Sequence, residues 1–137
     1  MDCNASTKGI LLVDDDNEMR DLLRDVLSDE GYEVVEAANG AEALLLLHRQ
    51  SFAAIILDKN MPGLSGLDLL PGIRTICPQT PVILITAFGD VATYQEAREK
   101  GAFEYLFKPF GMEAILQVLR KALAQQGMPT APMGSEA

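Results

Sequence analysis

The sequence predicts an α/β fold, with a doubly wound parallel sheet of five strands and helices on both of its faces. Short apolar runs rich in valine and isoleucine alternate five times with segments whose apolar residues recur at helical spacing. The links between them are short, and strands that alternate with helices in this way form parallel sheets. At 137 residues, the chain has the length of one such domain.

Strands are expected where apolar residues run without a break, which is typical of strands that are buried on both faces. These segments are residues 9–14, 32–37, 53–57, 81–86 and 103–107. Helices are expected where apolar residues recur every three or four positions. These segments are residues 17–30, 41–50, 65–77, 90–100 and 112–124.

Three residues mark helix ends or breaks. Gly31 and Gly101 directly follow the first and fourth helical segments and are expected to end them, because glycine accepts the left-handed conformation found at helix C-termini. Pro71 falls inside the third helical segment and cannot donate a backbone hydrogen bond. The third helix is therefore expected to kink or to end near Pro71.

A single domain is expected over residues 8–124. Residues 1–7 are polar, and from residue 127 the chain consists largely of Gly, Pro, Met, Ser and Ala without periodicity. Residues 1–7 and 125–137 are therefore interpreted as a flexible N-terminus and a flexible tail.

The composition excludes several classes of protein. The net charge of −9 argues against direct binding to nucleic acid or to an anionic membrane, because both need clustered lysine and arginine, but it suits a cation site. Cys3 and Cys77 have neither metal-ligand spacing nor a disulfide pattern. No apolar segment resembles a signal peptide or is long enough to cross a bilayer. The sequence predicts a cytoplasmic protein without membrane insertion.

Polar residues stand at the ends of four predicted strands. Asp14 and Asp15 end the first strand, Asp58 the third, Thr86 the fourth and Lys108 the fifth. In an open parallel sheet these carboxyl ends lie at one edge, which is where ligands bind. Three carboxylates, a hydroxyl and an ammonium group are therefore expected to meet there.

These groups are chemically complementary. Three carboxylates held close together repel one another, and a hard divalent cation such as Mg²⁺ removes that repulsion. One carboxylate is then available to attack phosphorus and form an acyl phosphate. Thr86 and Lys108 would bind the charged phosphoryl oxygens. A buried strand that ends in Asp58 leads to the hypothesis that Asp58 becomes phosphorylated.

Four motifs resemble the receiver domain of two-component response regulators. They are ILLVDDD at residues 10–16, IILDKNMPGLSG at 55–66, VILITA at 82–87 and YLFKPF at 105–110. They occur in the order found in that family, and the resemblance covers about residues 8–124. It implies the flavodoxin-like (βα)5 receiver fold with strand order 2-1-3-4-5.

The resemblance also implies a role for each site residue. Asp58 would accept a phosphoryl group from a histidine kinase. The implied ligands of Mg²⁺ or Mn²⁺ are Asp14 (largely through water), Asp15, Asp58 and the carbonyl of Asn60. The implied phosphoryl-binding residues are Thr86, Ala87 and Lys108. Thr86 and Tyr105 would act as the switch, with Tyr105 turning from an exposed to a buried position on phosphorylation, and Pro109 would form a cis peptide that aims Lys108 inward.

The implied partners are a sensor histidine kinase or phosphotransfer protein and a downstream protein. The downstream protein would bind the face formed by the fourth helix, the fifth strand and the fifth helix, and the resemblance also allows a homodimer that forms on phosphorylation. Such a module is not an enzyme beyond its own phosphorylation and dephosphorylation. If these 137 residues are the whole protein, it is a stand-alone single-domain regulator.

Two alternatives remain open. In a haloacid-dehalogenase-type phosphatase, an apolar strand ends in Asp-x-Asp, which Asp14 and Asp16 match, and Asp14 would be the nucleophile. A binding module of the same fold would act without any phosphorylation. The identity of the phosphorylated residue separates these alternatives from the receiver hypothesis.

Overall fold

The computed structural model describes residues 9–58, 66–86, 95–96, 98–99, 101–107 and 111–127. Its strands are β1 (Gly9–Val13), β2 (Glu33–Ala37), β3 (Ala54–Asp58), β4 (Val82–Thr86) and β5 (Glu104–Phe107). Its helices are α1 (Asn17–Asp29), α2 (Gly40–Arg49), α3 (Gly66–Ile76) and α5 (Met112–Gly127). The strands pair in parallel in the order β2-β1-β3-β4-β5, which confirms the predicted fold class and strand order.

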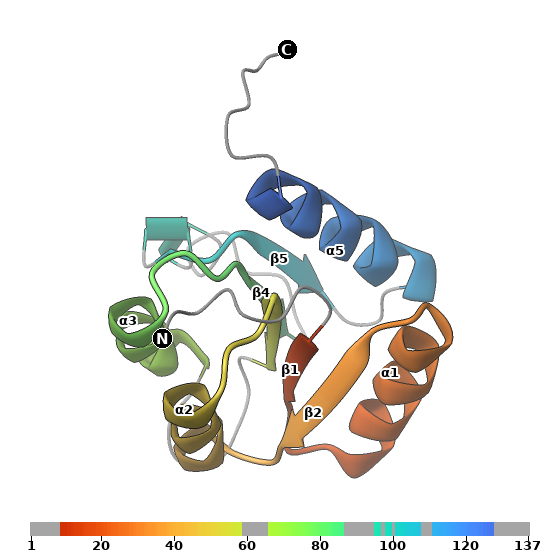
Figure 1. The fold of residues 1–137 in the computed structure, drawn as a ribbon, viewed down its shortest axis with the longest axis horizontal. Coiled ribbons are helices and arrows are strands. Elements are labelled where there is room, and N and C mark those ends of the chain that lie inside the picture. Colours follow the sequence, from red (N-terminus) through yellow and green to blue (C-terminus); the bar gives the residue numbers. More distant parts are fainter. Residues whose placement is uncertain are drawn as a thin grey trace.

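Helices cover both faces of the sheet (Figure 1). Along β1, Leu11 and Val13 belong to the core cluster that also contains buried residues of α2 and α3. Ile10 and Leu12 belong to the cluster that contains buried residues of α1 and α5. Successive residues of a strand point to opposite faces, so a strand covered on both sides must be apolar throughout. This explains why the central strands read as unbroken apolar runs.

The boundaries of α1 follow from its sequence. The Asp16 carboxylate accepts hydrogen bonds from the backbone N–H groups of Glu18 and Met19, which caps the first turn. At the other end, Gly31 has a φ of 95°, its N–H donates to the Ser28 carbonyl, and Tyr32 N–H donates to the Leu27 carbonyl. This is a Schellman motif, and it confirms that Gly31 ends the helix.

Gly101 also has the expected conformation. Its φ is 106°, and its N–H donates to the Arg98 carbonyl at 3.1 Å. Of the helix predicted over residues 90–100, the structure describes residues 95–96 and 98–99, and these are helical.

Two predictions about helix boundaries are wrong. The expected end of the third helix near Pro71 is not observed, because α3 continues to Ile76, while the other expectation, a kink at Pro71, stays a prediction. Pro71 is exposed, and the following turn packs the buried Ile73 against the core, which holds the helix together beyond the missing hydrogen bond. The last helix ends at Gly127 rather than at Ala124, so residues 125–127 belong to α5 and not to a flexible tail. Two of these three residues are glutamines, which are good helix formers.

The expected N-terminal segment (residues 1–7) and residues 128–137 lie outside the described part of the chain. None of the helices in the described part has the length and apolarity that crossing a bilayer requires.

Candidate functional site

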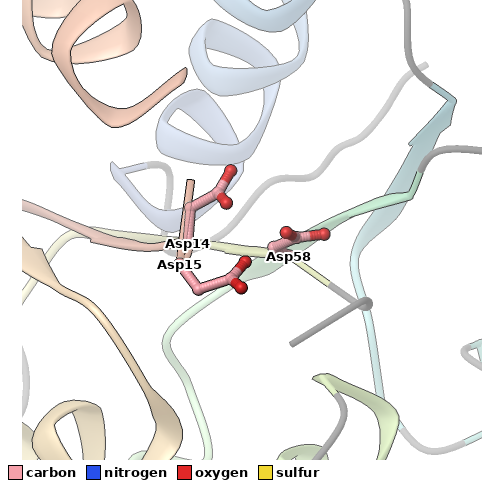
Figure 2. A group of neighbouring side chains, drawn as sticks. All are labelled: Asp14, Asp15 and Asp58. Atoms are coloured by element: carbon pink, nitrogen blue, oxygen red, sulfur yellow. The ribbon is translucent and has the colours of Figure 1, made fainter. Parts of the chain in front are cut away.

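Three carboxylates meet at the carboxyl ends of two adjacent strands. Asp14 directly follows β1, Asp15 comes next, and Asp58 is the last residue of β3 (Figure 2). Val13 lies opposite Leu57 in the β1–β3 pairing, so the two strands end at the same level. One carboxylate oxygen from each residue lies within 4.8 Å of the other two. The predicted convergence of these residues is therefore observed.

The three carboxylates differ in exposure. Asp14 is fully buried and Asp58 is 2% exposed, whereas Asp15 faces solvent. A buried carboxylate is costly unless other groups compensate it. One such group is the backbone N–H of Asp16, which donates to Asp14 Oδ1 at 2.9 Å. Two buried carboxylates beside an exposed one form a site that is built into the sheet and is open to solvent on one side.

The residues at this edge fit a hard divalent cation. Their side chains supply carboxylate oxygens from three residues, and oxygen-only donor sets suit Mg²⁺ and Mn²⁺. Asp14, Asp15 and Asp58 could therefore hold such an ion. Asn60, the fourth expected ligand, lies outside the described residues.

Thr86 lies at the same edge of the sheet. It is the last residue of β4, is 1% exposed, and directly follows Ile85, which pairs with Asp58. The expected phosphoryl-binding residues Ala87 and Lys108, and Pro109 with its expected cis peptide, lie outside the described part of the chain. β5 ends at Phe107, immediately before Lys108.

Tyr105 lies inside the protein. It is on β5, pairs with Leu84 of β4 and is 6% exposed. It belongs to the core cluster on the face covered by α2 and α3. The structure thus has Tyr105 in the buried position that the resemblance assigned to the phosphorylated form.

Asp16 has a structural role. Its carboxylate caps α1, and it is not a member of the group formed by Asp14, Asp15 and Asp58. The phosphatase alternative needs Asp14 and Asp16 to act together. The structure instead brings Asp14 together with Asp15 and Asp58.

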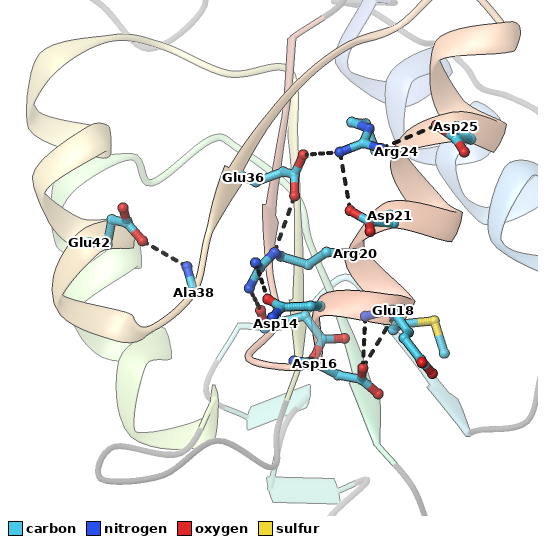
Figure 3. A network of polar contacts seen from close by, with 12 residues as sticks. Asp14, Asp16, Glu18, Arg20, Asp21, Arg24, Asp25, Glu36, Ala38 and Glu42 are labelled. Atoms are coloured by element: carbon cyan, nitrogen blue, oxygen red, sulfur yellow. Dashed lines mark hydrogen bonds and ion pairs between the residues drawn. The ribbon is translucent and has the colours of Figure 1, made fainter.

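Sequence reasoning missed a network of charged residues beside this site (Figure 3). Arg20 of α1 donates to the Asp14 carbonyl oxygen at 2.6 Å and to Glu36 Oε1 of β2 at 3.2 Å. Arg24 donates to the other carboxylate oxygen of Glu36 at 3.0 Å, and this hydrogen bond raises the pKa of Arg24. The spacing of Arg20 and Arg24 by one helical turn indicates that they lie on the same side of α1. Nothing local in the sequence, however, indicates that Glu36 is their common partner.

The sequence matches the family model described as the response regulator receiver domain over residues 10–120. It is 45% identical over 117 residues to the response regulator protein FleR of Pseudomonas aeruginosa. The match covers 85% of this chain but only 25% of FleR, so the chain spans about a quarter of that relative. It is also 36% identical over 114 residues to sporulation initiation phosphotransferase F of Bacillus subtilis, covering 83% of this chain and 92% of that protein.

Solved structures agree with this match. A CheY-like response regulator receiver domain protein from Methanospirillum hungatei has a TM-score of 0.87 at 29% identity, covering 91% of this chain and all of that one (100%). A response regulator protein from Burkholderia pseudomallei has a TM-score of 0.79 at 30% identity, covering 89% of this chain and 72% of that one. The latter crystal structure contains a phosphorylated aspartic acid, a calcium ion and citrate.

The family model spans most of the chain, and the sheet order and the acidic edge agree with it. The matching family is thus a different one from the haloacid-dehalogenase family of the phosphatase alternative. The chain therefore belongs to the receiver domains of two-component response regulators, which are signalling modules.

Proposed function

We propose that this chain is the phospho-accepting receiver of a two-component phosphorelay, and that Asp58 is the residue that becomes phosphorylated. The observation that carries the proposal is the meeting of three carboxylates within 4.8 Å at adjacent strand ends. Asp58 is the last residue of β3, the central strand of the sheet, and is almost completely buried. The phosphorylated aspartic acid of the Burkholderia protein supports the same chemistry.

The reaction is a transfer between two nucleophiles. A carboxylate oxygen of Asp58 attacks the phosphorus of a phosphohistidine on a histidine kinase or a phosphotransfer protein. The new P–O bond forms as the P–N bond breaks, and the histidine ring leaves with the electron pair of that bond. Asp58 becomes an acyl phosphate.

The neighbouring residues bind the charged groups. Asp14, Asp15, Asp58 and the carbonyl of Asn60 would hold Mg²⁺ or Mn²⁺. When bound, the ion offsets the repulsion between the carboxylates and the phosphoryl oxygens. Thr86, Ala87 and Lys108 would bind the phosphoryl oxygens, with Thr86 approaching from the adjacent strand β4.

The signal would leave through residues 90–100, β5 and α5. Thr86 moves toward the phosphoryl group, and Tyr105 on the neighbouring strand stabilises the resulting arrangement from inside the core. Phosphorylation then shifts an equilibrium between two existing states, and a downstream protein, or a second copy of the chain, binds one of them better. We place this exchange in the cytoplasm, where histidine kinases present their phosphohistidine.

Phosphorylation of the purified chain tests the proposal. Acetyl phosphate with Mg²⁺ should add one phosphoryl group to the wild type and none to Asp58→Asn, as measured by mass spectrometry. A matched control is Asp29→Asn, which changes an exposed carboxylate at the end of α1 and should be labelled like the wild type. A chelator should abolish labelling.

The outcomes are distinct. Equal labelling of Asp58→Asn and the wild type would overturn the assignment of Asp58. If the wild type is not labelled at all, by acetyl phosphate or by a panel of phosphorylated kinases, the phosphorylation-independent binding module becomes the better description.

A further inference from the structure

Arg20 joins three separate parts of the chain beside the acidic edge (Figure 3). Its guanidinium donates to the Asp14 carbonyl at 2.6 Å, to the side-chain oxygen of Asn17, and to Glu36 Oε1 of β2 at 3.2 Å. Its side chain is only 15% exposed. A planar guanidinium with five N–H groups can bind several acceptors at once, whereas the ammonium group of lysine is a single point charge.

These contacts hold the main chain that carries two of the three carboxylates. The backbone N–H of Asp14 donates to the Ala37 carbonyl of β2 at 3.1 Å, and the carbonyl of Asp14 accepts from Arg20. That carbonyl belongs to the peptide group between Asp14 and Asp15. Because the peptide group is planar, holding this carbonyl also holds the Cα atoms of Asp14 and Asp15, from which the two side chains extend.

We propose that Arg20 is a positioning residue for the cation site, acting through the peptide group between Asp14 and Asp15. This inference rests on the proposed function, because it takes that site to bind Mg²⁺. Glu36 of β2 supports this role, because its Oε1 accepts a hydrogen bond from the Arg20 guanidinium. Arg24 binds the other carboxylate oxygen of Glu36.

The charge of Arg20 and its positioning role have opposite effects on metal affinity. A cation beside the site repels Mg²⁺, so if charge alone mattered, removing Arg20 would tighten binding. If Arg20 positions the carboxylates, its removal weakens binding, because the ligands lose their fixed directions. The sign of the change therefore separates the two roles.

Arg24 provides a matched control. It lies one helical turn from Arg20, carries the same charge and binds the same carboxylate of Glu36 at 3.0 Å. Among the described residues, Arg24 forms ion pairs with Glu36, Asp21 and Asp25, which are not members of the acidic group. Arg24→Ala thus removes an arginine near the site without removing the bond to the Asp14 carbonyl.

The test is a titration of the full chain with Mg²⁺ alone, by calorimetry or by amide NMR, on the wild type, Arg20→Ala, Arg20→Lys and Arg24→Ala. Loss of an outer partner of a metal ligand typically lowers metal affinity about 10- to 100-fold. We expect a Kd about tenfold higher for Arg20→Ala, an intermediate value for Arg20→Lys, and a Kd equal to or lower than the wild-type value for Arg24→Ala.

Hydrogen exchange supplies a readout that needs no metal. The backbone N–H groups of Asp14 and Asp16 donate within this arrangement, to the Ala37 carbonyl and to Asp14 Oδ1. In the metal-free protein these two amides should exchange faster in Arg20→Ala than in Arg24→Ala, while amides in α5 exchange equally in both.

A folded Arg20→Ala protein that binds Mg²⁺ as tightly as the wild type, or more tightly, would overturn the inference. If Arg20→Ala does not fold, Arg20→Lys decides: a raised Kd supports the positioning role, and an unchanged Kd refutes it. Failure of the wild type itself to bind Mg²⁺ would overturn the proposed metal site and the inference together. A failure of the inference alone is therefore distinguishable from a failure of the proposed function.

Discussion

Asp58 pairs with Ile85 across β3 and β4, so the residue after Ile85, Thr86, lies at the same edge of the sheet as the Asp58 carboxylate. Both side chains are buried, Asp58 at 2% and Thr86 at 1% exposure. This pairing brings a hydroxyl-bearing residue to the strand end beside the proposed phosphorylation site.

Thr86→Val should weaken binding of the phosphoryl group while leaving Mg²⁺ affinity unchanged. Valine keeps the shape of threonine at this buried position and removes only the hydroxyl. A hydrogen bond to a charged group contributes about 1.5–3 kcal/mol, so the Kd for the phosphoryl mimic beryllofluoride should rise by roughly 10- to 150-fold. Thr86→Ser keeps the hydroxyl and should bind within a few-fold of the wild type. Equal beryllofluoride affinity in Thr86→Val would contradict the assignment.

Mg²⁺ should stabilise the folded protein through its acidic edge. At a Mg²⁺ concentration ten times Kd, the free energy of unfolding should rise by about 1.4 kcal/mol, because the ion binds the folded state only. Asp15→Asn removes one expected ligand and should lose most of this increment, as measured by urea unfolding with and without Mg²⁺. Asp29→Asn, which lies at the far end of α1, should keep it in full. The same increment in Asp15→Asn and the wild type would argue against Asp15 as a ligand.

Gly101→Ala should destabilise the fold. Gly101 has a φ of 106°, where a side chain costs about 1–2 kcal/mol, and an added Cβ would lie 2.7 Å from Cδ of Arg74. That arginine donates to the carbonyls of Pro78 and Thr80, so pushing it aside disturbs the turn before β4. Thermal or urea unfolding measures the loss.

Gly72→Ala is the matched control for Gly101→Ala. Gly72 is inside α3, and an added Cβ would make an ordinary contact, 3.8 Å from Leu44 Cδ2. This substitution should stabilise the fold by about 0.5–1 kcal/mol, because alanine favours helix over glycine. If both variants shift stability in the same direction, the conformational explanation for Gly101 is wrong.

Activation should change the environment of β5 and α5 more than that of α2. Tyr105 is already buried in this structure, so we expect phosphorylation to increase the population of a state that exists without phosphate. Amide NMR of the chain with Mg²⁺ and beryllofluoride should show shifts beyond the site at β5 and α5, and Asp58→Asn should show none of them. Shifts confined to α1 and α2 would contradict the proposed output face.

The sequence by itself determined the order and type of the described elements and the convergence of Asp14, Asp15 and Asp58. Apolar periodicity is a local property that distinguishes strand from helix, and most predicted boundaries fall within one or two residues of those observed. In a parallel sheet, polar residues at the carboxyl ends of central strands meet at one edge, so the acidic group could be predicted without coordinates. The Gly31 helix end was predictable for the same reason, because a Schellman motif involves only neighbouring residues.

Only the tertiary structure decided the features that depend on segments far apart in the sequence. Arg20 meets Glu36 because α1 packs beside β2, and no local pattern in either segment specifies the other. Tyr105 is buried, and α3 continues past Pro71, because packing against the core overrides local preferences. Hydrophobic periodicity shows which face of an element is buried, but not which polar side chain of a helix meets which side chain of a strand, since that depends on the distance and direction between packed elements.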